Sequence, residues 1–154
     1  MDCSWIEPGI LAAGSIPFNA DHIRSLHQKG IRAILSLTER PLTAFQEITP
    51  SLLDGLDILC FHVPLPGQRP PSFEQARHIM QIINRVTAQQ RPLFVHGQAG
   101  VGRTGTVLCL YYLMRGKSLE EAQAILKARR VQSVWVTDDQ LRFLKEVATV
   151  VARL

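Results

Sequence analysis

The amino-acid sequence predicts an α/β fold. We expect a single domain over residues 1–154, with a central, mostly parallel sheet of four to five strands, helices on both faces and a helical C-terminal portion. Short apolar, β-branched segments alternate with longer segments of helical periodicity. The short apolar run PLFVH at 92–96 is typical of a strand at the centre of a parallel sheet. Beyond residue 101 the remaining patterns are helical.

The N-terminal third supplies the first three strands. The turn residues Pro8 and Gly9 separate two short strands, and a helix follows that ends at Gly30. The stretch IRAILSL at 31–37 is apolar and β-branched, which predicts a buried strand.

The middle of the chain alternates between helix and strand. Residues 41–55 are expected to be partly helical, with Pro50 and Gly55 as breaks, and 56–64 is expected to form another strand. The segment LPGQRPPS at 65–72 contains three prolines and a glycine, which predict an irregular loop.

The last part of the chain is predicted to be helical around one further strand. Ser72 is a candidate cap for a long amphipathic helix that precedes the strand at 92–96. An apolar helix ending at Gly116 follows, and Ser118 with Glu121 forms a capping box for the next one. A final helix is expected to begin near Thr137.

The composition narrows the possible partners. The formal net charge is +4 and the pI about 9.3, which suits an anionic ligand. Because the basic residues are dispersed and no aromatic ladder accompanies them, we expect no nucleic-acid partner. No window approaches the roughly 18 apolar residues of a membrane span, and the first residues lack a signal-peptide pattern. We therefore expect no membrane partner, a cytoplasmic location and a monomer.

Three cysteines, Cys3, Cys60 and Cys109, have no metal-ligand spacing. Each lies in an apolar stretch, so we expect reduced and buried thiols. We expect neither a metal nor another cofactor.

The stretch VHGQAGVGRTGT, Val95 to Thr106, predicts a strand, a glycine loop and a helix in succession. Backbone N–H groups of such a loop can converge on an anion, and the helix N-terminus adds its free donors and its dipole. The planar guanidinium of Arg103 can bind two phosphate oxygens. We therefore expect a phosphate-binding loop made of Gln98, Ala99, Gly100, Val101, Gly102 and Arg103.

A nucleotide-binding loop is one interpretation of this stretch. GQAGVGRT matches G-x-x-x-x-G-K-[ST] except that Arg103 stands where lysine is required. Arginine is a poor replacement for that compact charge. About fifty residues follow the loop, and their helical patterns leave no strand for a nucleotide fold and no aspartate at a strand end for magnesium.

A second interpretation accounts for more of the chain. The loop resembles H-C-x-x-G-x-x-R-[ST] of protein tyrosine and dual-specificity phosphatases, with His96, Gly100, Arg103 and Thr104 in register and Gly97 where the cysteine stands. The segments SWIEPGILAAGS, GIRAILSLTER and ARRVQSVWVTDDQ resemble further parts of the small atypical dual-specificity phosphatases, so the resemblance covers nearly the whole chain.

The resemblance implies a reaction in which a cysteine thiolate attacks phosphorus and forms a phosphocysteine intermediate. The loop amides and Arg103 would stabilise the transferring phosphoryl group. The resemblance also assigns His96 to lowering the thiol pKa and Thr104 to stabilising the departing thiolate. Arg130 is similar to a family arginine near the site, and Gln140 to a polar residue that orients water.

Gly97 removes the nucleophile, and two explanations stay open. The glycine is an introduced change that yields an inert, phosphate-binding form, or it is natural and the chain is a pseudophosphatase that binds phosphorylated ligands. His96 and Thr104, whose implied roles serve a thiolate, are retained and favour an enzyme lineage.

A second departure concerns the general acid, which in the resembled family is an aspartate in the loop before the long helix. Here Leu65 or Gly67 takes its place. A general acid contributes roughly 10²–10⁴-fold to the rate. The nearest carboxylates in the sequence are expected to be surface or capping groups; they are Asp57, Glu74, Asp138 and Asp139.

The loop also bears on the substrate. Residues 98–102 contain no lysine or arginine, whereas phosphoinositide phosphatases tend to carry basic residues there. We expect a shallow site that accepts a phosphorylated protein or a small phosphomonoester, with a phosphate or sulfate ion able to occupy the loop. Trp5 and Trp135 are expected to be core or loop anchors rather than ligand platforms.

Overall fold

The sheet is built around the strand that precedes the glycine loop. The computed structural model describes residues 1–98 and 101–152. Its five strands are arranged in the order β1-β2-β5-β3-β4, in which β1 is antiparallel to β2 and the other neighbours are parallel. The strands are β1 (Cys3–Glu7), β2 (Leu11–Gly14), β3 (Ala33–Ser36), β4 (Leu59–His62) and β5 (Leu93–His96).

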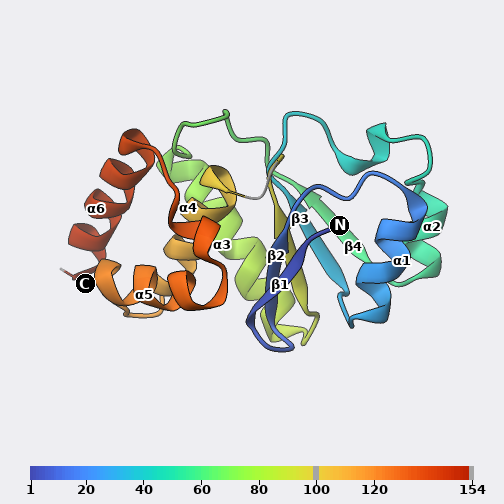
Figure 1. Cartoon of the computed structure of the whole chain (residues 1–154), viewed down its shortest axis with the longest axis horizontal. Helices are drawn as coiled ribbons and strands as arrows, with labels where there is room; N and C mark the ends of the chain where they lie inside the picture. The colour runs from blue at the N-terminus through green and yellow to red at the C-terminus, as the bar shows by residue number, and fades with distance from the viewer. Residues whose placement is uncertain (99–100, 153–154) are drawn as a thin grey trace.

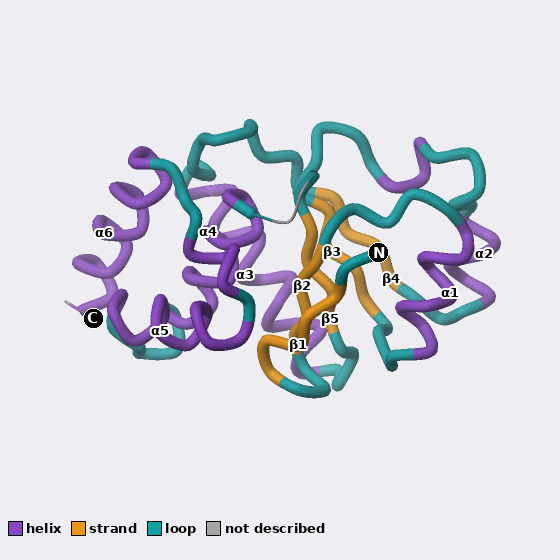
Figure 2. Tube along the Cα trace, viewed as in Figure 1, coloured by secondary structure: helices purple, strands orange, loops and turns teal. Residues whose placement is uncertain are grey.

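Helices cover both faces of this sheet (Figures 1 and 2). One face carries α1 (Ala20–Gln28) and α2 (Pro50–Gly55); the other carries α3 (Phe73–Ala88), α4 (Gly102–Leu113), α5 (Leu119–Arg129) and α6 (Asp138–Ala152). Two short 3₁₀ helices are η1 (Leu42–Ala44) and η2 (Val131–Val134). Each face of the sheet carries a hydrophobic core. Neighbouring side chains of a strand point to opposite faces, so that in β3 Ile34 packs with α1 and α2 and Leu35 packs with α3 and α4.

The predicted fold class is confirmed, including the central position of β5 and the helical C-terminal portion. Both expected caps are present: Ser72 forms a capping box with Gln75, and Ser118 forms one with Glu121. After β5 the described residues form helices and no strand. The nucleotide-binding interpretation, which needs later strands, therefore has no support in the fold.

Two expectations were wrong. Pro50 does not interrupt the segment 41–55 but begins α2, because Thr49 caps the helix and a proline at the first position has no N–H that needs a partner. Of the three cysteines expected to be buried, only Cys109 is; Cys60 is exposed and Cys3 is partly buried, because β4 and β1 are the edge strands of the sheet, each with a neighbouring strand on one side only. Among the described residues, no helix has the length and apolar character needed to cross a membrane.

Candidate active site

The glycine loop leaves β5 at the carboxyl end of the parallel strands, where ligand sites of α/β sheets lie. At its far side α4 begins at Gly102, and the preceding residue, Val101, provides no side-chain cap. The helix N-terminus is therefore open to an anion. Gly105 allows α4 to pack closely on η2, since a Cβ there would lie 2.1 Å from the Ser133 carbonyl oxygen.

A hollow of about 460 Å³ lies over this loop. Its floor is formed by residues of the loop, among them Gly97 and Arg103. Gly67 and Gln68 from the loop before α3 and Trp135 and Thr137 from the segment before α6 also line it, and the Thr137 hydroxyl donates to the Gln68 carbonyl oxygen at 2.8 Å. The hollow thus joins three segments that are far apart in the sequence. Ala99 and Gly100, which the sequence also predicts to bind phosphate, lie outside the described residues.

Arg103 is held on one side by the protein and faces Gly97 with the other. Its side chain is 10% exposed, and Nη1 donates to Glu39 Oε1 at 2.7 Å and to the Leu65 carbonyl oxygen at 3.1 Å. Its Nε lies 3.5 Å from the position of a Cβ built on Gly97. The contacts on Nη1 fix the guanidinium, so its Nε edge is presented toward the floor of the hollow, where two parallel N–H groups suit a phosphate.

The position of Gly97 has room for a side chain. A Cβ built there meets Arg103 Cβ, Arg103 Nε and Thr104 Oγ1, each at 3.5 Å, which is ordinary van der Waals contact. The Thr104 hydroxyl is buried and has no hydrogen-bond partner within the described part of the chain. An unpaired buried hydroxyl costs free energy, so this group is placed for a partner at or above position 97.

His96 is a neutral, fully buried residue. Its Nδ1 lies 3.0 Å from the Gly97 carbonyl oxygen, which only accepts, so Nδ1 carries the proton and Nε2 accepts from the Ser36 hydroxyl at 2.7 Å. Burial lowers the pKa of His96 to about 4. The imidazole therefore acts on the loop through this hydrogen bond and not through a positive charge at neutral pH.

Glu39 is a site residue that the sequence analysis missed. It follows β3, next to the loop, and its exposed carboxylate pairs with Arg103. Its own backbone N–H and then the Arg103 guanidinium hold the pKa of Glu39 below its usual range. The available signal was the motif TER at the carboxyl end of a predicted parallel strand, since such ends meet at one edge of the sheet.

The loop before α3 brings no acid to the site. Leu65 is buried and contributes only its carbonyl oxygen, and Gly67 lines the hollow without a side chain. The four carboxylates considered from the sequence lie elsewhere. Asp57 pairs with Arg91 and Asp139 with Arg142, while Glu74 and Asp138 lie in the first turns of α3 and α6.

Of the two accessory residues that the sequence suggests, Gln140 lies next to the loop and Arg130 does not line the hollow. Gln140 is fully buried and lies next to the loop: a Cβ built on Gly102 would be 2.9 Å from the Gln140 Oε1 atom. The same Oε1 accepts a hydrogen bond from the Thr137 N–H at the start of α6. Arg130 forms an ion pair with Asp2 at 2.7 Å and donates to Ser4 Oγ of β1 at 3.2 Å, so it joins the end of α5 to the N-terminal strand. It does not line the hollow over the loop.

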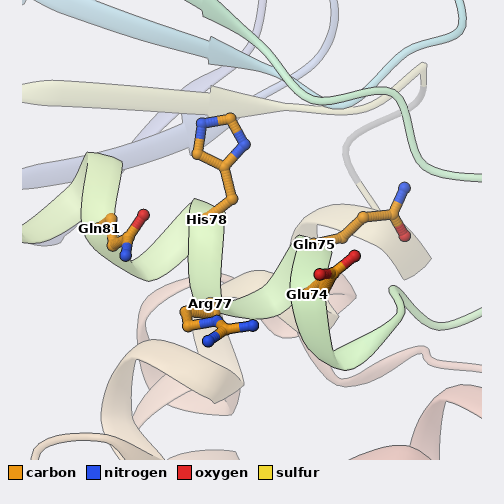
Figure 3. A pocket seen from close by; sticks show the side chains of 5 residues that line it. All are labelled: Glu74, Gln75, Arg77, His78 and Gln81. Carbon is orange, nitrogen blue, oxygen red and sulfur yellow. The ribbon is translucent and has the colours of Figure 1, made fainter.

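A second hollow lies on the surface of α3 and is lined by Glu74, Gln75, Arg77, His78 and Gln81 (Figure 3). These side chains come from one helix, and those of Arg77 and His78 point in different directions. The described residues contain no group of three or more histidine, cysteine, aspartate or glutamate side chains placed to hold a metal ion. The chemistry-bearing groups gather at the glycine loop instead.

Comparisons with known proteins identify the family and the fold of the chain. A family model described as PTP-SAK, Swiss Army Knife protein, DSP-PTPase phosphatase domain, matches residues 1–151. A mutant form of Tk-PTP is 25% identical, with a TM-score of 0.83 over 99% of this chain and 98% of that one. PTPMT1 is 19% identical, with a TM-score of 0.84 over 99% and 97%. Human DUSP28 is 16% identical, with a TM-score of 0.75 over 97% and 95%.

The family model spans nearly the whole chain, and the matched structures share its fold from end to end. The chain therefore belongs to the DSP-PTPase phosphatase domain family, that of the dual-specificity and protein tyrosine phosphatases.

Proposed function

We propose that this chain is a phosphomonoester-binding phosphatase domain in a form without its nucleophile, so that it binds phosphate but does not turn it over. The observation that carries the proposal is the surroundings of Gly97. A side chain fits there, the Thr104 hydroxyl is unpartnered in the described structure, and Arg103 Nε faces the same point. These groups would serve a cysteine at position 97.

With cysteine at position 97, Sγ would attack phosphorus while the bond to the leaving oxygen breaks and that oxygen takes a proton. Arg103 and the loop N–H groups would hold the three other phosphate oxygens. A water would then attack phosphorus, give its proton to the group that had donated one, and release inorganic phosphate as the S–P bond breaks. Thr104 would hydrogen-bond the thiolate that leaves.

Glu39 is our candidate for the proton donor. None of the described residues that line the hollow is acidic, but Glu39 forms an ion pair with one of them, Arg103. Its lowered pKa keeps it ionised while the site is empty. A bound phosphate dianion adds negative charge beside it, which raises the pKa of Glu39 and allows it to hold a proton.

The proton donor is testable with two substrates. In a Gly97→Cys form, a further Glu39→Gln change should slow hydrolysis of an alkyl phosphate by roughly 10²-fold or more. It should slow an aryl phosphate far less, because that leaving oxygen needs less protonation. Equal slowing of both substrates would show that Glu39 does not donate the proton.

A phospho-ligand binding module is the second candidate. The absence of an aspartate or glutamate between Val63 and Ser72 favours it, because such a module needs Arg103 and the loop but no proton donor. Both candidates place a phosphorylated protein or a small phosphomonoester in the same hollow, and they differ in whether cysteine at position 97 restores turnover.

Phosphate binding tests what the two candidates share. Calorimetric titration with inorganic phosphate should show binding to the chain as it stands that is as tight as, or tighter than, binding to its Gly97→Cys form, because a thiolate repels the dianion. Arg103→Gln should remove most of the affinity, whereas Arg142→Gln, which breaks an exposed pair on α6, should leave it unchanged. Binding that survives Arg103→Gln would contradict the proposed site.

A further inference from the structure

We infer that His62, at the end of β4, is a positioning residue: its imidazole holds the turn that places the Glu39 carboxylate on Arg103, and so influences how tightly the empty site binds phosphate. The inference rests on the proposed phosphate binding by Arg103 and the loop. His62 is partly buried and does not line the hollow. Its Nε2 lies 2.6 Å from the Thr38 carbonyl oxygen. Because a carbonyl oxygen only accepts, Nε2 carries the ring proton.

The imidazole continues a ladder of backbone hydrogen bonds beyond the end of β3. Two N–H groups of the chain after β4 donate to carbonyl oxygens at the end of β3, each at 3.0 Å: Val63 to Ser36 and Leu65 to Leu37. Thr38 is the next residue, and the imidazole supplies the donor for its carbonyl oxygen. Thr38 is buried, so a carbonyl group left there without a donor would cost free energy.

A second hydrogen bond holds the same turn on the other side of Glu39. The Thr38 hydroxyl donates to the Arg40 carbonyl oxygen at 2.7 Å. Glu39 therefore lies between two anchored carbonyl groups, although its own side chain is 65% exposed. A glutamate on a mobile turn would lose more freedom on pairing with an arginine than one on a fixed turn does.

These contacts give His62 an effect on the ligand without touching it. The imidazole holds Thr38, the turn holds Glu39, and Glu39 Oε1 accepts from Arg103 Nη1 at 2.7 Å. The Glu39 backbone N–H and then the Arg103 guanidinium hold the pKa of Glu39 below its usual range, and both contacts depend on the shape of the turn. If the turn loosens, the ion pair weakens and phosphate meets less competition at Arg103.

Two amide variants isolate the hydrogen bond. The amide nitrogen of His62→Gln can take the place of the imidazole Nε2, whereas that of His62→Asn ends near the place of Nδ1 and does not reach the Thr38 carbonyl group. NMR titration should show the pKa of Glu39 rising toward its usual range in His62→Asn and staying low in His62→Gln. His78→Asn, on the surface of α3, is the control and should change nothing.

Calorimetric titration measures the consequence for binding. At low salt His62→Asn should bind inorganic phosphate roughly 1.5- to threefold more tightly than the unchanged chain, which is part of the value of an exposed ion pair. His62→Gln should bind it as the unchanged chain does. When Glu39→Gln is also present, His62→Asn should add nothing, because the competing charge is already gone.

Three results would overturn the inference. In the first, His62→Asn leaves the Glu39 pKa and the phosphate affinity unchanged. In the second, the gain in affinity persists when Glu39→Gln is also present. In the third, nitrogen NMR of the unchanged chain finds the proton of the neutral His62 ring on Nδ1; this measurement decides the matter even if His62→Asn does not fold.

Failure of the proposed function has a different signature. If the unchanged chain binds no inorganic phosphate, the proposed function is refuted together with the effect of His62 on affinity. The Glu39 pKa in His62→Asn and His62→Gln is measured without phosphate, so it tests the positioning of Glu39 in either case.

Discussion

We expect Glu39 to compete with phosphate for Arg103, because the two side chains form an ion pair in the empty site. Glu39 Oε1 lies 2.7 Å from Arg103 Nη1, so the Glu39 carboxylate offsets part of the positive charge that Arg103 would offer to a phosphate dianion. Glu39→Gln keeps the size of the side chain and removes its charge. We therefore expect this variant to bind inorganic phosphate more tightly than the unchanged chain.

The exposure of the two partners sets the size of the effect. The Arg103 side chain is 10% exposed but that of Glu39 is 65% exposed, so solvent screens the pair. Exposed pairs are worth about 0.2–1 kcal/mol, which corresponds to roughly a 1.4- to fivefold change in affinity. Repulsion between Glu39 and the dianion acts in the same direction and is weakened by salt. We expect two- to fivefold tighter binding at low salt, as a rough estimate from these terms.

Calorimetric titration at two salt concentrations measures this effect. Asp57→Asn is the matched control, because it also removes one negative charge and breaks an exposed pair with an arginine, Arg91, outside the hollow. The gain for Glu39→Gln should shrink as salt is added. If Glu39→Gln binds phosphate no more tightly than Asp57→Asn, Glu39 does not compete for Arg103.

Two further predictions concern stability and protonation. Gly105→Ala should lower the free energy of unfolding by about 1–3 kcal/mol, because its Cβ would lie 2.1 Å from the Ser133 carbonyl oxygen. Gly55→Ala is the control and should not lower it, since its Cβ meets nothing within 4 Å. Equal stability of the two variants would contradict the close contact at Gly105. His96 should stay neutral until the pH falls toward about 4. Because the unfolded chain protonates this histidine near pH 6.5, stability should be full above that pH and decrease by up to about 3 kcal/mol as the pH falls to 4. NMR titration of the His96 ring checks this, and a midpoint near 6.5 would contradict it.

Local patterns in the sequence were enough to predict most of the fold. The run at 92–96 is apolar because β5 is covered on both faces, and the caps Ser72 and Ser118 satisfy N–H groups that lie three residues away. Pro50 was misjudged because a proline begins a helix as readily as it ends one.

The site, like the fold, was predicted only in part from the sequence. The residues of the glycine loop are neighbours in the sequence, so a motif can reveal them, and Gly97, Arg103 and Thr104 do lie together. Glu39 and Trp135 come from other parts of the chain and meet the loop only because β3 lies next to β5 and η2 packs on α4. Their contribution depends on tertiary contacts that no local pattern records.

Turnover of an aryl phosphate without added metal tests the central claim most directly, with the chain as it stands compared with its Gly97→Cys form. Gly97→Ser is the control, since serine occupies the same space but is a weaker nucleophile. The account predicts hydrolysis by the cysteine form alone, with a phosphocysteine intermediate. A cysteine form that binds phosphate and remains inert would contradict the enzyme assignment and leave a phosphate-binding module.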